Sequence, residues 1–519
     1  MHLENSRNIS ISAKNNGNDI ARFVESEVNR LISKGLLLDG KVSSKFRRKI
    51  VKTLTNGAQG MFRWVEMSLE ALKRIKFTKD FKKALGQLPS ELSGLYDIIH
   101  TQIDRTEPYG REVAIMTLKW LLCAQRLLSV SELIAAISVI DEDAAESSSN
   151  SDKGDELRSE QVPSPENDII RLCRNLVVMD SEKGVFRFAH QFVRDYLLGR
   201  QEYTAVEQHV LATERCLDVY LTESWPGFIT PKLMQQNHIL KPYAKVYWPV
   251  HYKYIEDYES HELLRKVSRF TKQGSKTSPA YLQWASEISS QFRDHGGWES
   301  LGINLNDRLG YRLLFASSRP HSYLSAACAF GFLSFMRDCE LSSIDWSRRQ
   351  SLRNEKYTLL LVAAEEGHET VMRVLIEYEA DVNAQGGEYC NALQAASWGG
   401  HDQVVQMLLD KGADVNAQGG YYGNALQAAS WGGHDQVMQM LLDKGADVNA
   451  QGGYYGNALQ AASYEGHDQV VRLLLNHDAI SSRKDMQGRT PSHLASAGGR
   501  KKIVAMLSSF GSDLTITDT

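Results

Sequence analysis

The C-terminal third of the chain repeats itself with a period of 33 residues, and this period constrains the fold more than any other feature of the sequence. Two heptapeptides carry the repeat: Asn-Ala-Leu-Gln-Ala-Ala-Ser, which begins at 391, 424 and 457, and Asp-Val-Asn-Ala-Gln-Gly-Gly, which begins at 381, 414 and 447. The blocks 391–423 and 424–456 differ only at Val405 against Met438, as expected of a recent duplication. A period of this length predicts a solenoid, in which each unit buries its apolar face only against its neighbours.

Each block contains the signals of two short helices and a hairpin. Asn391 is a good helix N-cap, and Gly399-Gly400 ends that helix because glycine adopts left-handed conformations at low cost. Apolar residues then recur at the spacing of a second helix: Val404, Val405, Leu408 and Leu409. Lys411-Gly412 ends the second helix, and the string from Asp414 supplies turn residues for a hairpin.

The last block carries the string Thr490-Pro-Ser-His-Leu-Ala495, which nearly spells the Thr-Pro-Leu-His-x-Ala opening of the ankyrin repeat. The C-terminal region therefore resembles the ankyrin-repeat family, whose members bind other proteins. The inner blocks have Asn-Ala-Leu-Gln in place of this opening, and we expect their glutamines to hydrogen-bond between repeats: Gln394, Gln427 and Gln460. Residues 358–381 fit as a diverged repeat and 324–331 as a weaker first one, so about five clear units are expected over 319–519.

The resemblance also indicates a binding surface. In ankyrin-repeat proteins, the residues before the Gly-His turn and at the hairpin tips form a concave recognition face. Here these positions are aromatic: Trp398, Trp431, Tyr464, Tyr389, Tyr421, Tyr422, Tyr454 and Tyr455. Trp and Tyr are enriched in interaction hot spots, so we expect a protein ligand on this face, with the first three rings about 10 Å apart, the width of a helix pair. The alternative is that the rings pack against adjacent repeats.

Composition argues against several other classes of partner. The formal net charge is -4, so there is no global basic field to attract nucleic acid or an anionic membrane, and neither is expected as a partner. The six cysteines are scattered and show no zinc-binding spacing. We therefore expect a reducing compartment, and we expect neither a metal nor any other cofactor. No run of about 18 apolar residues and no signal peptide occur, so we expect a cytoplasmic protein.

The first 200 residues predict a helical bundle followed by a winged helix, so the fold class expected for the chain is mainly α. Apolar stripes at helical spacing begin near Asp19 and continue to Ile103. Ser129 and Glu132 have the spacing of a capping box, Val185–Phe188 reads as a strand, and a final helix runs from His190 to Leu198. The stretch 141–167 is rich in Ser, Glu and Asp, which predicts a disordered insertion.

The same region resembles fungal NACHT-ankyrin proteins, which are signal-transducing receptors of the NLR type. The resemblance rests on six strings: Gly60-Met-Phe-Arg-Trp-Val65, Leu88-Pro89, Leu95-Tyr96-Asp97, Trp120-Leu-Leu122, Leu128-Ser-Val-Ser-Glu-Leu133 and Phe188-Ala-His-Gln-Phe-Val-Arg-Asp-Tyr-Leu197. It implies a helical remnant that follows a NACHT domain over 1–104, a winged helix over 105–200, and a helical connector over 201–318 before the repeats.

A NACHT domain needs a phosphate-binding loop of the form G-x-x-x-x-G-K-[ST]. The nearest string, Gly35-Leu-Leu-Leu-Asp-Gly-Lys41-Val42, ends in a residue without a hydroxyl and follows an expected helix, so we interpret it as a helix terminus. The resemblance implies that His190 senses bound ADP. Without the loop we interpret His190 as structural, and keep the sensor role for the case in which a separate polypeptide supplies the NACHT domain.

Two functional hypotheses follow. The first is a non-enzymatic recognition and scaffold protein of the NLR type, whose repeats bind a protein ligand and couple it to signalling or to self/non-self recognition, as in innate immunity. The second is an ATP- or ADP-dependent signalling switch that acts with a NACHT domain supplied elsewhere. Self-association through the N-terminal half is left open in both.

The first prediction concerns nucleotide binding. We expect the purified chain to bind neither ATP nor ADP in the presence of magnesium, because no string supplies both the loop and the hydroxyl. Isothermal titration calorimetry checks this. Saturable nucleotide binding that is lost in Lys41→Ala would contradict the interpretation of the 35–42 string as a helix terminus.

Overall fold

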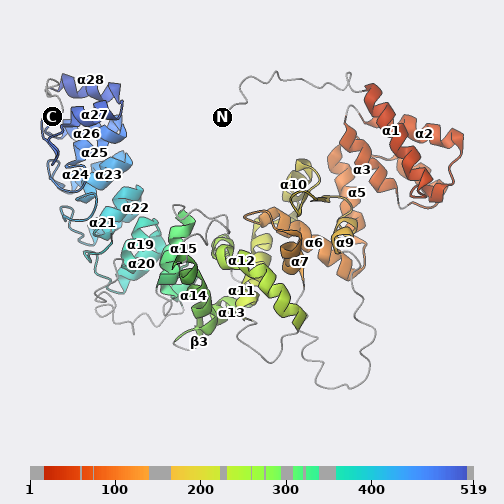
Figure 1. Cartoon of the computed structure of the whole chain (residues 1–519), viewed down its shortest axis with the longest axis horizontal. Coiled ribbons are helices and arrows are strands. Elements are labelled where there is room, and N and C mark those ends of the chain that lie inside the picture. The colour runs from red at the N-terminus through yellow and green to blue at the C-terminus, as the bar shows by residue number, and fades with distance from the viewer. Residues whose placement is uncertain are drawn as a thin grey trace. The chain divides into compact units, whose positions relative to one another are not determined.

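The structure is a computed structural model, and it describes residues 17–58, 61–73, 75–138, 165–221, 231–258, 260–273, 276–293, 308–318, 323–337, 358–387 and 389–510. The chain divides into two compact units. Unit 1 comprises Met1–Arg215 and Phe228–Lys241, and unit 2 comprises Cys216–Gly227 and Pro242–Thr519. Both units are mainly helical, as the sequence predicts (Figure 1).

Unit 1 begins with a helical bundle. Its elements are α1 (Gly17–Ser33), η1 (Leu38–Gly40), α2 (Ser44–Gly57), α3 (Phe62–Leu72), α4 (Thr78–Gly86) and α5 (Leu92–Asp104). Trp64 lies at the centre, where its Nε1 donates to the carbonyl of Pro89 at 2.8 Å. A Cβ atom at Gly57 would lie 2.4 Å from the Trp64 ring, so the end of α2 packs on this ring only because residue 57 is glycine.

The segment that most resembles a phosphate loop is a helix terminus. After α1 the chain turns through Gly35, which has a φ of 69°. Leu37 and Leu38 then point into the core, with 0% and 5% of their surface exposed. The segment then forms the short 3-10 helix η1 (Leu38–Gly40), and its buried leucines belong to the core of the bundle.

A winged helix follows within unit 1 (Figure 1). Its elements are α6 (Pro108–Cys123), α7 (Val130–Ile137), α9 (Pro165–Leu172), β1 (Val177–Asp180), β2 (Val185–Phe188) and α10 (Gln191–Leu198). The predicted capping box is present, because Ser129 Oγ accepts from the amide of Glu132 at 3.2 Å and Glu132 Oε2 accepts from the amide of Ser129 at 2.9 Å. The wing is an antiparallel hairpin of β1 and β2, extended by a single bridge from Ser129 to Val185.

Two expectations for this region need correction. The sequence predicted only the strand at 185–188, whereas the structure pairs it with a second strand, β1, whose register places Val177 opposite Phe188. The insertion expected over 141–167 lies outside the described residues as far as 164, but residues 165–167 begin helix α9. Helix α9 has a buried Ile169 that anchors it to the domain core, which the polar composition of the stretch conceals.

The winged helix and the bundle share contacts through two of the strings that carry the family resemblance. Tyr196 on α10 donates its hydroxyl proton to Asp97 on α5 at 2.7 Å, and Arg200 donates to the same carboxylate at 3.0 Å. The rings of Tyr96 and Tyr196 lie 5.2 Å apart. The two segments are therefore joined into one unit.

Between the winged helix and the repeats lies a helical connector built around aromatic rings. Its elements are η2 (Gln201–Tyr203), α11 (Ala205–Leu221), α12 (Pro231–Lys253), α13 (His261–Thr271), β3 (Lys272–Gln273), β4 (Lys276–Thr277), α14 (Pro279–Arg293) and α15 (Arg308–Ser318). In unit 2 the Trp248 ring contacts Phe270 at 5.0 Å and Trp284 at 5.3 Å. Trp248 also stacks on Phe335 of the first repeat at 6.3 Å, so this aromatic cluster runs directly into the repeat stack.

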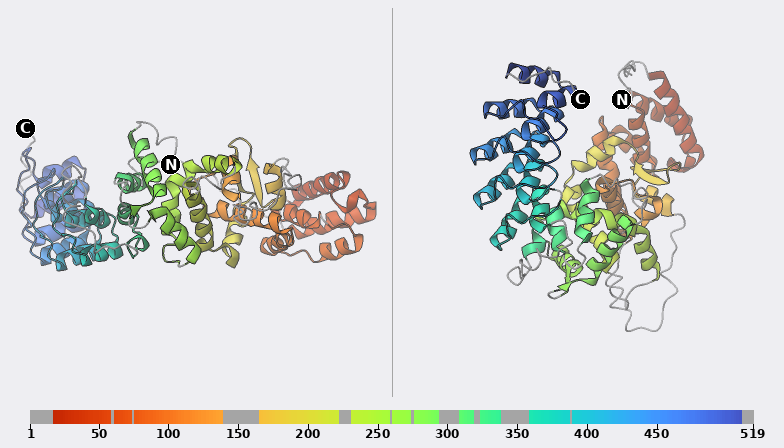
Figure 2. Two further views of the ribbon diagram at one scale, coloured as in Figure 1. Left: turned by 90° about the horizontal axis from the view of Figure 1, so that it is seen from below. Right: turned by 60° about the vertical axis from the view of Figure 1, so that its left-hand side comes forward.

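The repeats form six helix pairs within the described residues, stacked in register (Figure 2). They are α16 (Leu324–Phe330) with α17 (Ser334–Arg337), α19 (Leu359–Glu365) with α20 (Glu369–Glu377), α21 (Ala392–Gly399) with α22 (Asp402–Asp410), α23 (Ala425–Gly432) with α24 (Asp435–Asp443), α25 (Ala458–Glu465) with α26 (Asp468–Asn476), and α27 (Pro491–Ala497) with α28 (Lys501–Ser509). The weak segment at 324–331 therefore forms a helix pair in addition to the five units expected. Asn391 caps α21 as predicted, and Gly400 follows it with a φ of 70°.

Hydrogen bonds between repeats recur at the same position in each unit. Nε2 of His401, His434 and His467 lies 2.8–2.9 Å from a backbone carbonyl near the end of the first helix of the preceding unit. At the last junction Nε of Arg500 donates to the carbonyl of Tyr464 at 3.2 Å, in place of a histidine. Burial lowers the pKa of His401, so this imidazole is neutral at pH 7 and donates through its Nε2 hydrogen.

Glutamine and asparagine side chains add two further series of bonds. Gln394 and Gln427 reach the hairpin that connects their helix pair to the next one, where their Nε2 atoms donate to the carbonyls of Ala417 at 3.1 Å and Ala450 at 3.2 Å. Asn416 does the same at the loop after the second helix: its Nδ2 donates to the carbonyl of Gly445 at 3.0 Å, and its Oδ1 accepts from the amide of Asp447 at 2.8 Å. Each junction is thus closed by side chains that the repeated sequence supplies.

The second prediction tests the histidine series. His434→Ala removes one inter-repeat hydrogen bond and leaves the carbonyl of Trp398 without its donor, so we expect the free energy of unfolding to fall by about 1–2 kcal/mol. His477→Ala is the control, since His477 lies exposed at the end of α26. Urea unfolding of the two variants measures the difference, and equal midpoints would mean that the histidine bond adds nothing to the stack.

Candidate protein-binding surface

One continuous cluster of aromatic rings lies along the repeat stack, and we call it the aromatic strip. It consists of Tyr389, Trp398, Tyr421, Tyr422, Trp431, Tyr454, Tyr455 and Tyr464. The tyrosines other than Tyr464 lie on the hairpins, and the two tryptophans and Tyr464 lie near the ends of α21, α23 and α25. The structure therefore brings together all eight residues that the sequence singled out.

The rings contact one another both within and between repeats. Trp398 and Trp431 stack with their centroids 6.3 Å apart and their planes at 20°. Tyr421 stacks on Tyr454 of the next hairpin at 5.3 Å. The spacing of about 10 Å predicted from the width of a helix pair is wrong for the two tryptophans, because their rings lean toward each other across the junction instead of pointing straight out.

Exposure divides the strip into two groups. Tyr422 is 9% exposed and lies between Tyr389, at 5.8 Å, and Trp431, at 5.6 Å. In contrast, Tyr454 is 59% exposed, Tyr421 45% and Tyr464 39%. Packing between repeats, the alternative considered from the sequence, is thus present in the inner rings, while the outer rings present a large aromatic area to solvent.

The Trp431 side chain is held by a hydrogen bond to the next hairpin. Its Nε1 donates to the hydroxyl of Tyr455 at 3.0 Å. The backbone amide of Tyr454 also donates to the carbonyl of Tyr421 at 2.9 Å, so neighbouring hairpins are tied to each other at their tips. These bonds fix the orientation of the exposed rings, which reduces the conformational entropy that a ligand would have to remove.

A group of charged residues lies at the N-terminal end of the strip. Glu365 ends α19 at the position that corresponds to Trp398 in the next unit, and it accepts a hydrogen bond from the Tyr311 hydroxyl at 3.2 Å. Its neighbour Glu366 forms ion pairs with Arg308, at 2.9 Å, and with Arg312, both on α15. Helix α15 is therefore bound to the first clear repeat by charge, and sequence periodicity gave no sign of this contact.

The two glutamates have different environments. Burial raises the pKa of Glu365 to about 7, and the nearby Glu366 carboxylate adds to the rise. Glu366 has both guanidinium groups as partners, so its charge is compensated. The carboxyl group of Glu365 is thus half protonated near neutral pH.

The histidines singled out elsewhere in the sequence make hydrogen bonds to the backbone. His190 is exposed and caps α10, where its Nδ1 accepts from the amide of Phe192 at 3.2 Å and its ring stacks on Phe192 at 4.9 Å. The ring nitrogens of His401 and His434 bond to backbone carbonyl groups. Across the residues that the structure describes, no group of three His, Cys, Asp or Glu side chains is arranged to hold a metal ion.

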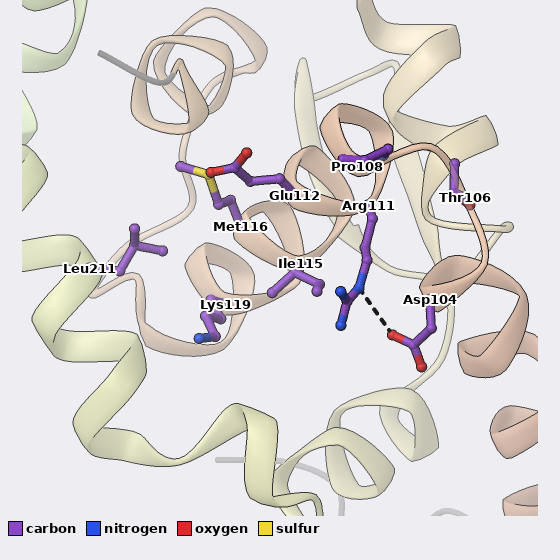
Figure 3. A pocket seen from close by; sticks show the side chains of 9 residues that line it. All are labelled: Asp104, Thr106, Pro108, Arg111, Glu112, Ile115, Met116, Lys119 and Leu211. Carbon is purple, nitrogen blue, oxygen red and sulfur yellow. Dashed lines mark ion pairs between the residues drawn. The ribbon is translucent and has the colours of Figure 1, made fainter. Parts of the chain in front are cut away.

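A cleft of about 490 Å³ opens in unit 1 beside α6 and α11 (Figure 3). Arg111 points toward Asp104 with 3.5 Å between their nearest N and O atoms, and Lys119 pairs with Glu207 at 3.0 Å. Its cationic groups are therefore paired within the protein, and the wall between them is made by Ile115, Met116 and Leu211. Both cations in the lining thus have acidic partners, which leaves less positive charge for a phosphate group.

The helix before the wing begins with acidic residues. The helix that leads into the wing is α9. Helix α9 carries Glu166 and Asp168 in its first turn, and Asp168 pairs with Arg171 at 2.8 Å. Carboxylates on this helix would repel the phosphate backbone.

Comparison with known families agrees with this architecture. The family model described as "Ankyrin repeats (3 copies)" matches residues 324–419 and, a second time, residues 425–518. The C-terminal part of the chain consists of ankyrin repeats. The model described as "GPI inositol-deacylase, winged helix domain" matches residues 104–206, so a winged-helix domain of that type precedes them. No curated protein matches the chain.

Ankyrin repeats indicate a scaffold for interaction with other proteins. Among the described helices, none is both long enough and apolar enough to cross a lipid bilayer.

The third prediction concerns Glu365. Its folded-state pKa of about 7 lies above the unfolded value of 4.5, so its contribution to stability is present in full below pH 4.5 and is lost as the pH rises through 7. Glu365→Gln removes the buried charge and keeps the acceptor for Tyr311. We therefore expect the variant to be more stable than the wild type by up to about 3 kcal/mol at pH 8, and by less than about 1 kcal/mol at pH 5.

Glu366→Gln is the matched control for this substitution. It removes a compensated charge and leaves Arg308 and Arg312 without their partner, so it should lower the melting temperature at both pH values. Thermal unfolding followed by circular dichroism distinguishes the two variants. A stabilisation by Glu365→Gln of the same size at pH 5 and pH 8 would refute the raised pKa.

Proposed function

We propose that the chain is a non-enzymatic recognition and scaffold protein that binds a protein ligand through the aromatic strip of its ankyrin repeats. The observation that carries the proposal is the pair Tyr421 and Tyr454, two stacked rings on neighbouring hairpins that are each about half exposed. Large aromatic surfaces of this kind are rare on the outside of a protein that has no partner, and they are the commonest anchors of interfaces.

The surroundings of the strip support an extended protein ligand. Each hairpin string begins with one aspartate, and its remaining residues before the rings are Val, Asn, Ala, Gln and Gly, so the surface next to the tips is mainly uncharged. Backbone groups of a peptide segment could hydrogen-bond to the side-chain amides while its apolar side chains lie on the rings. Fixed rings lose little entropy on binding, which favours such a contact.

We further propose that the N-terminal half couples ligand binding to signalling in the manner of NLR-type receptors. The support is the resemblance of the six strings to fungal NACHT-ankyrin proteins, together with the contact between two of them, where Tyr196 bonds to Asp97. The winged helix and the preceding bundle then act as one signalling body. Nucleotide control through a NACHT domain on another polypeptide is less well supported, because His190 is engaged as a helix cap.

The fourth prediction separates binding rings from packing rings. We select peptide ligands for the full chain from a random phage-displayed library and measure their affinity for the variants by fluorescence anisotropy. Tyr421→Ala and Tyr454→Ala should each weaken binding by about 2 kcal/mol, roughly thirtyfold, with only a small change in stability because these rings are exposed.

Tyr422→Ala is the matched control on the same hairpin. Since Tyr422 is almost fully buried, its loss should lower the free energy of unfolding by about 3 kcal/mol and leave the affinity of the folded fraction nearly unchanged. If the exposed-ring variants bind the peptides as the wild type does, or if only Tyr422→Ala impairs binding, the strip is a packing feature and the proposal fails.

A further inference from the structure

The segment 41–83 is strongly basic, although the chain as a whole is not. It contains thirteen lysine or arginine residues and three acidic residues, a net charge of +10, whereas the full chain has a formal charge of -4. The sequence shows one basic run, Lys45 to Lys52, which a solvated helix face would explain. The structure shows where the other cations of this segment lie.

Helix α2 carries four cations on one face. Lys45, Arg48, Lys49 and Lys52 recur at intervals of three and four residues, and all are exposed, while Ile50 and Leu54 on the opposite side are buried. Helix α4 repeats the arrangement in its nine residues. Its exposed lysines are Lys79, Lys82 and Lys83, opposite the buried Phe81 and Leu85.

The two helices that carry these cations are in contact. The rings of Phe46 on α2 and Phe81 on α4 pack edge to face at 5.9 Å, which joins the start of α2 to the middle of α4. Lys82 Nζ lies 5.2 Å from the centre of the Phe46 ring, directly across the junction. Lysines that are some thirty residues apart in the sequence are therefore carried by two adjoining helices, and we call these exposed cations together the basic face.

The cations of the basic face have no acidic partners among the described residues. Their members are Lys45, Arg48, Lys49, Lys52, Lys76, Lys79, Lys82 and Lys83, and none of them takes part in an ion pair in the part of the chain that the structure covers. Elsewhere in unit 1, by contrast, ion pairs are frequent, as between Lys73 and Glu70 or Arg126 and Glu132. Repulsion among unpaired cations costs folding free energy, which an anionic partner would recover.

A single large apolar side chain protrudes from this surface. Phe77, the residue before α4, is 74% exposed and stands between Lys76 and Lys79. An exposed ring surrounded by lysines matches the surface of proteins that adsorb to a bilayer, where the ring enters the interface and the ammonium groups meet lipid headgroups.

We propose that the basic face binds the surface of an anionic membrane as a peripheral contact. Seven of its eight cations are lysines, which act as point charges toward phosphate and carboxylate headgroups, and lysine clusters of this size bind acidic lipids. Nucleic acid fits less well, because a single-stranded ligand needs successive stacking rings and base reading needs arginine forks or amides. The net charge of the whole chain argued against a membrane partner. A net charge is a sum over all residues, however, so it does not reveal a basic face on one segment.

The test is cosedimentation of the full chain with vesicles. One set contains phosphatidylcholine alone, and the other contains about one third phosphatidylserine, the acidic lipid of cytoplasmic leaflets. We expect binding only to the second set, weakened by salt because surface charges are screened. A variant with Lys49, Lys52, Lys79 and Lys83 changed to Gln should lose at least about a hundredfold in partition coefficient, since each lysine contributes about fivefold.

Lys82 is kept in this variant because it contacts Phe46, and circular dichroism verifies that the fold persists. The control changes four exposed lysines of the ankyrin repeats to Gln, with the same loss of charge: Lys411, Lys444, Lys484 and Lys501. It should bind the acidic vesicles as the wild type does. Phe77→Ser should weaken binding to the acidic vesicles about tenfold. The binding that remains is electrostatic, so added salt should reduce it more strongly than it reduces binding of the wild type.

Three results would overturn the proposal. The first is failure of the chain to bind the acidic vesicles, whether or not it binds a single-stranded RNA under the same conditions. The second is binding to the neutral vesicles as strong as binding to the acidic ones. The third is a loss of binding in the ankyrin control equal to that of the basic-face variant.

Discussion

One hydrogen bond determines how the repeats can stack. It joins a side chain at the start of the second helix of one repeat to the end of the first helix of the repeat before it. His434 illustrates the constraint, because its Nε2 reaches the carbonyl of Trp398 only if the ring passes over Gly400. A Cβ atom at Gly400 would lie 2.4 Å from His434 Nδ1, so glycine is required there both for its φ of 70° and for space. Because the histidine in turn fixes the separation of neighbouring units, the close contact of Trp398 with Trp431 follows from it.

Local sequence signals predicted most of the repeat stack, and the reason is that each unit is specified by short-range chemistry. The N-cap at Asn391, the glycine ends and the glutamine bonds are all encoded within a few residues of where they act. Predictions failed where a contact depends on residues distant in sequence. Strand β1 is held by pairing with β2 and has no alternating pattern of its own, and α4 is so short that only the burial of Phe81 and Leu85 identifies it.

The functional surfaces show the same division. Residue types pointed to the aromatic strip, yet which rings are exposed depends on how neighbouring hairpins meet, so the contrast between Tyr421 and Tyr422 could not be derived from sequence. The role of Glu365 was equally hidden, since its raised pKa depends on α15 covering the first clear repeat. The basic face required the contact of Phe46 with Phe81, a pair that no linear motif connects.

The near identity of blocks 391–423 and 424–456 has a consequence for how such a chain evolves. Each block contains all the hydrogen-bond donors and acceptors of a repeat, and the glycines that leave room for the neighbouring histidine. The contacts that one block makes with its neighbours can therefore also be made by its copy. Recombination between the copies can therefore insert or delete a whole block, and the new interface between repeats has the same contacts as the old one. The single difference, Val405 against Met438, lies at a buried site where both side chains fit. Each such event would change the length of the stack by 33 residues, and the area offered to a ligand by one repeat.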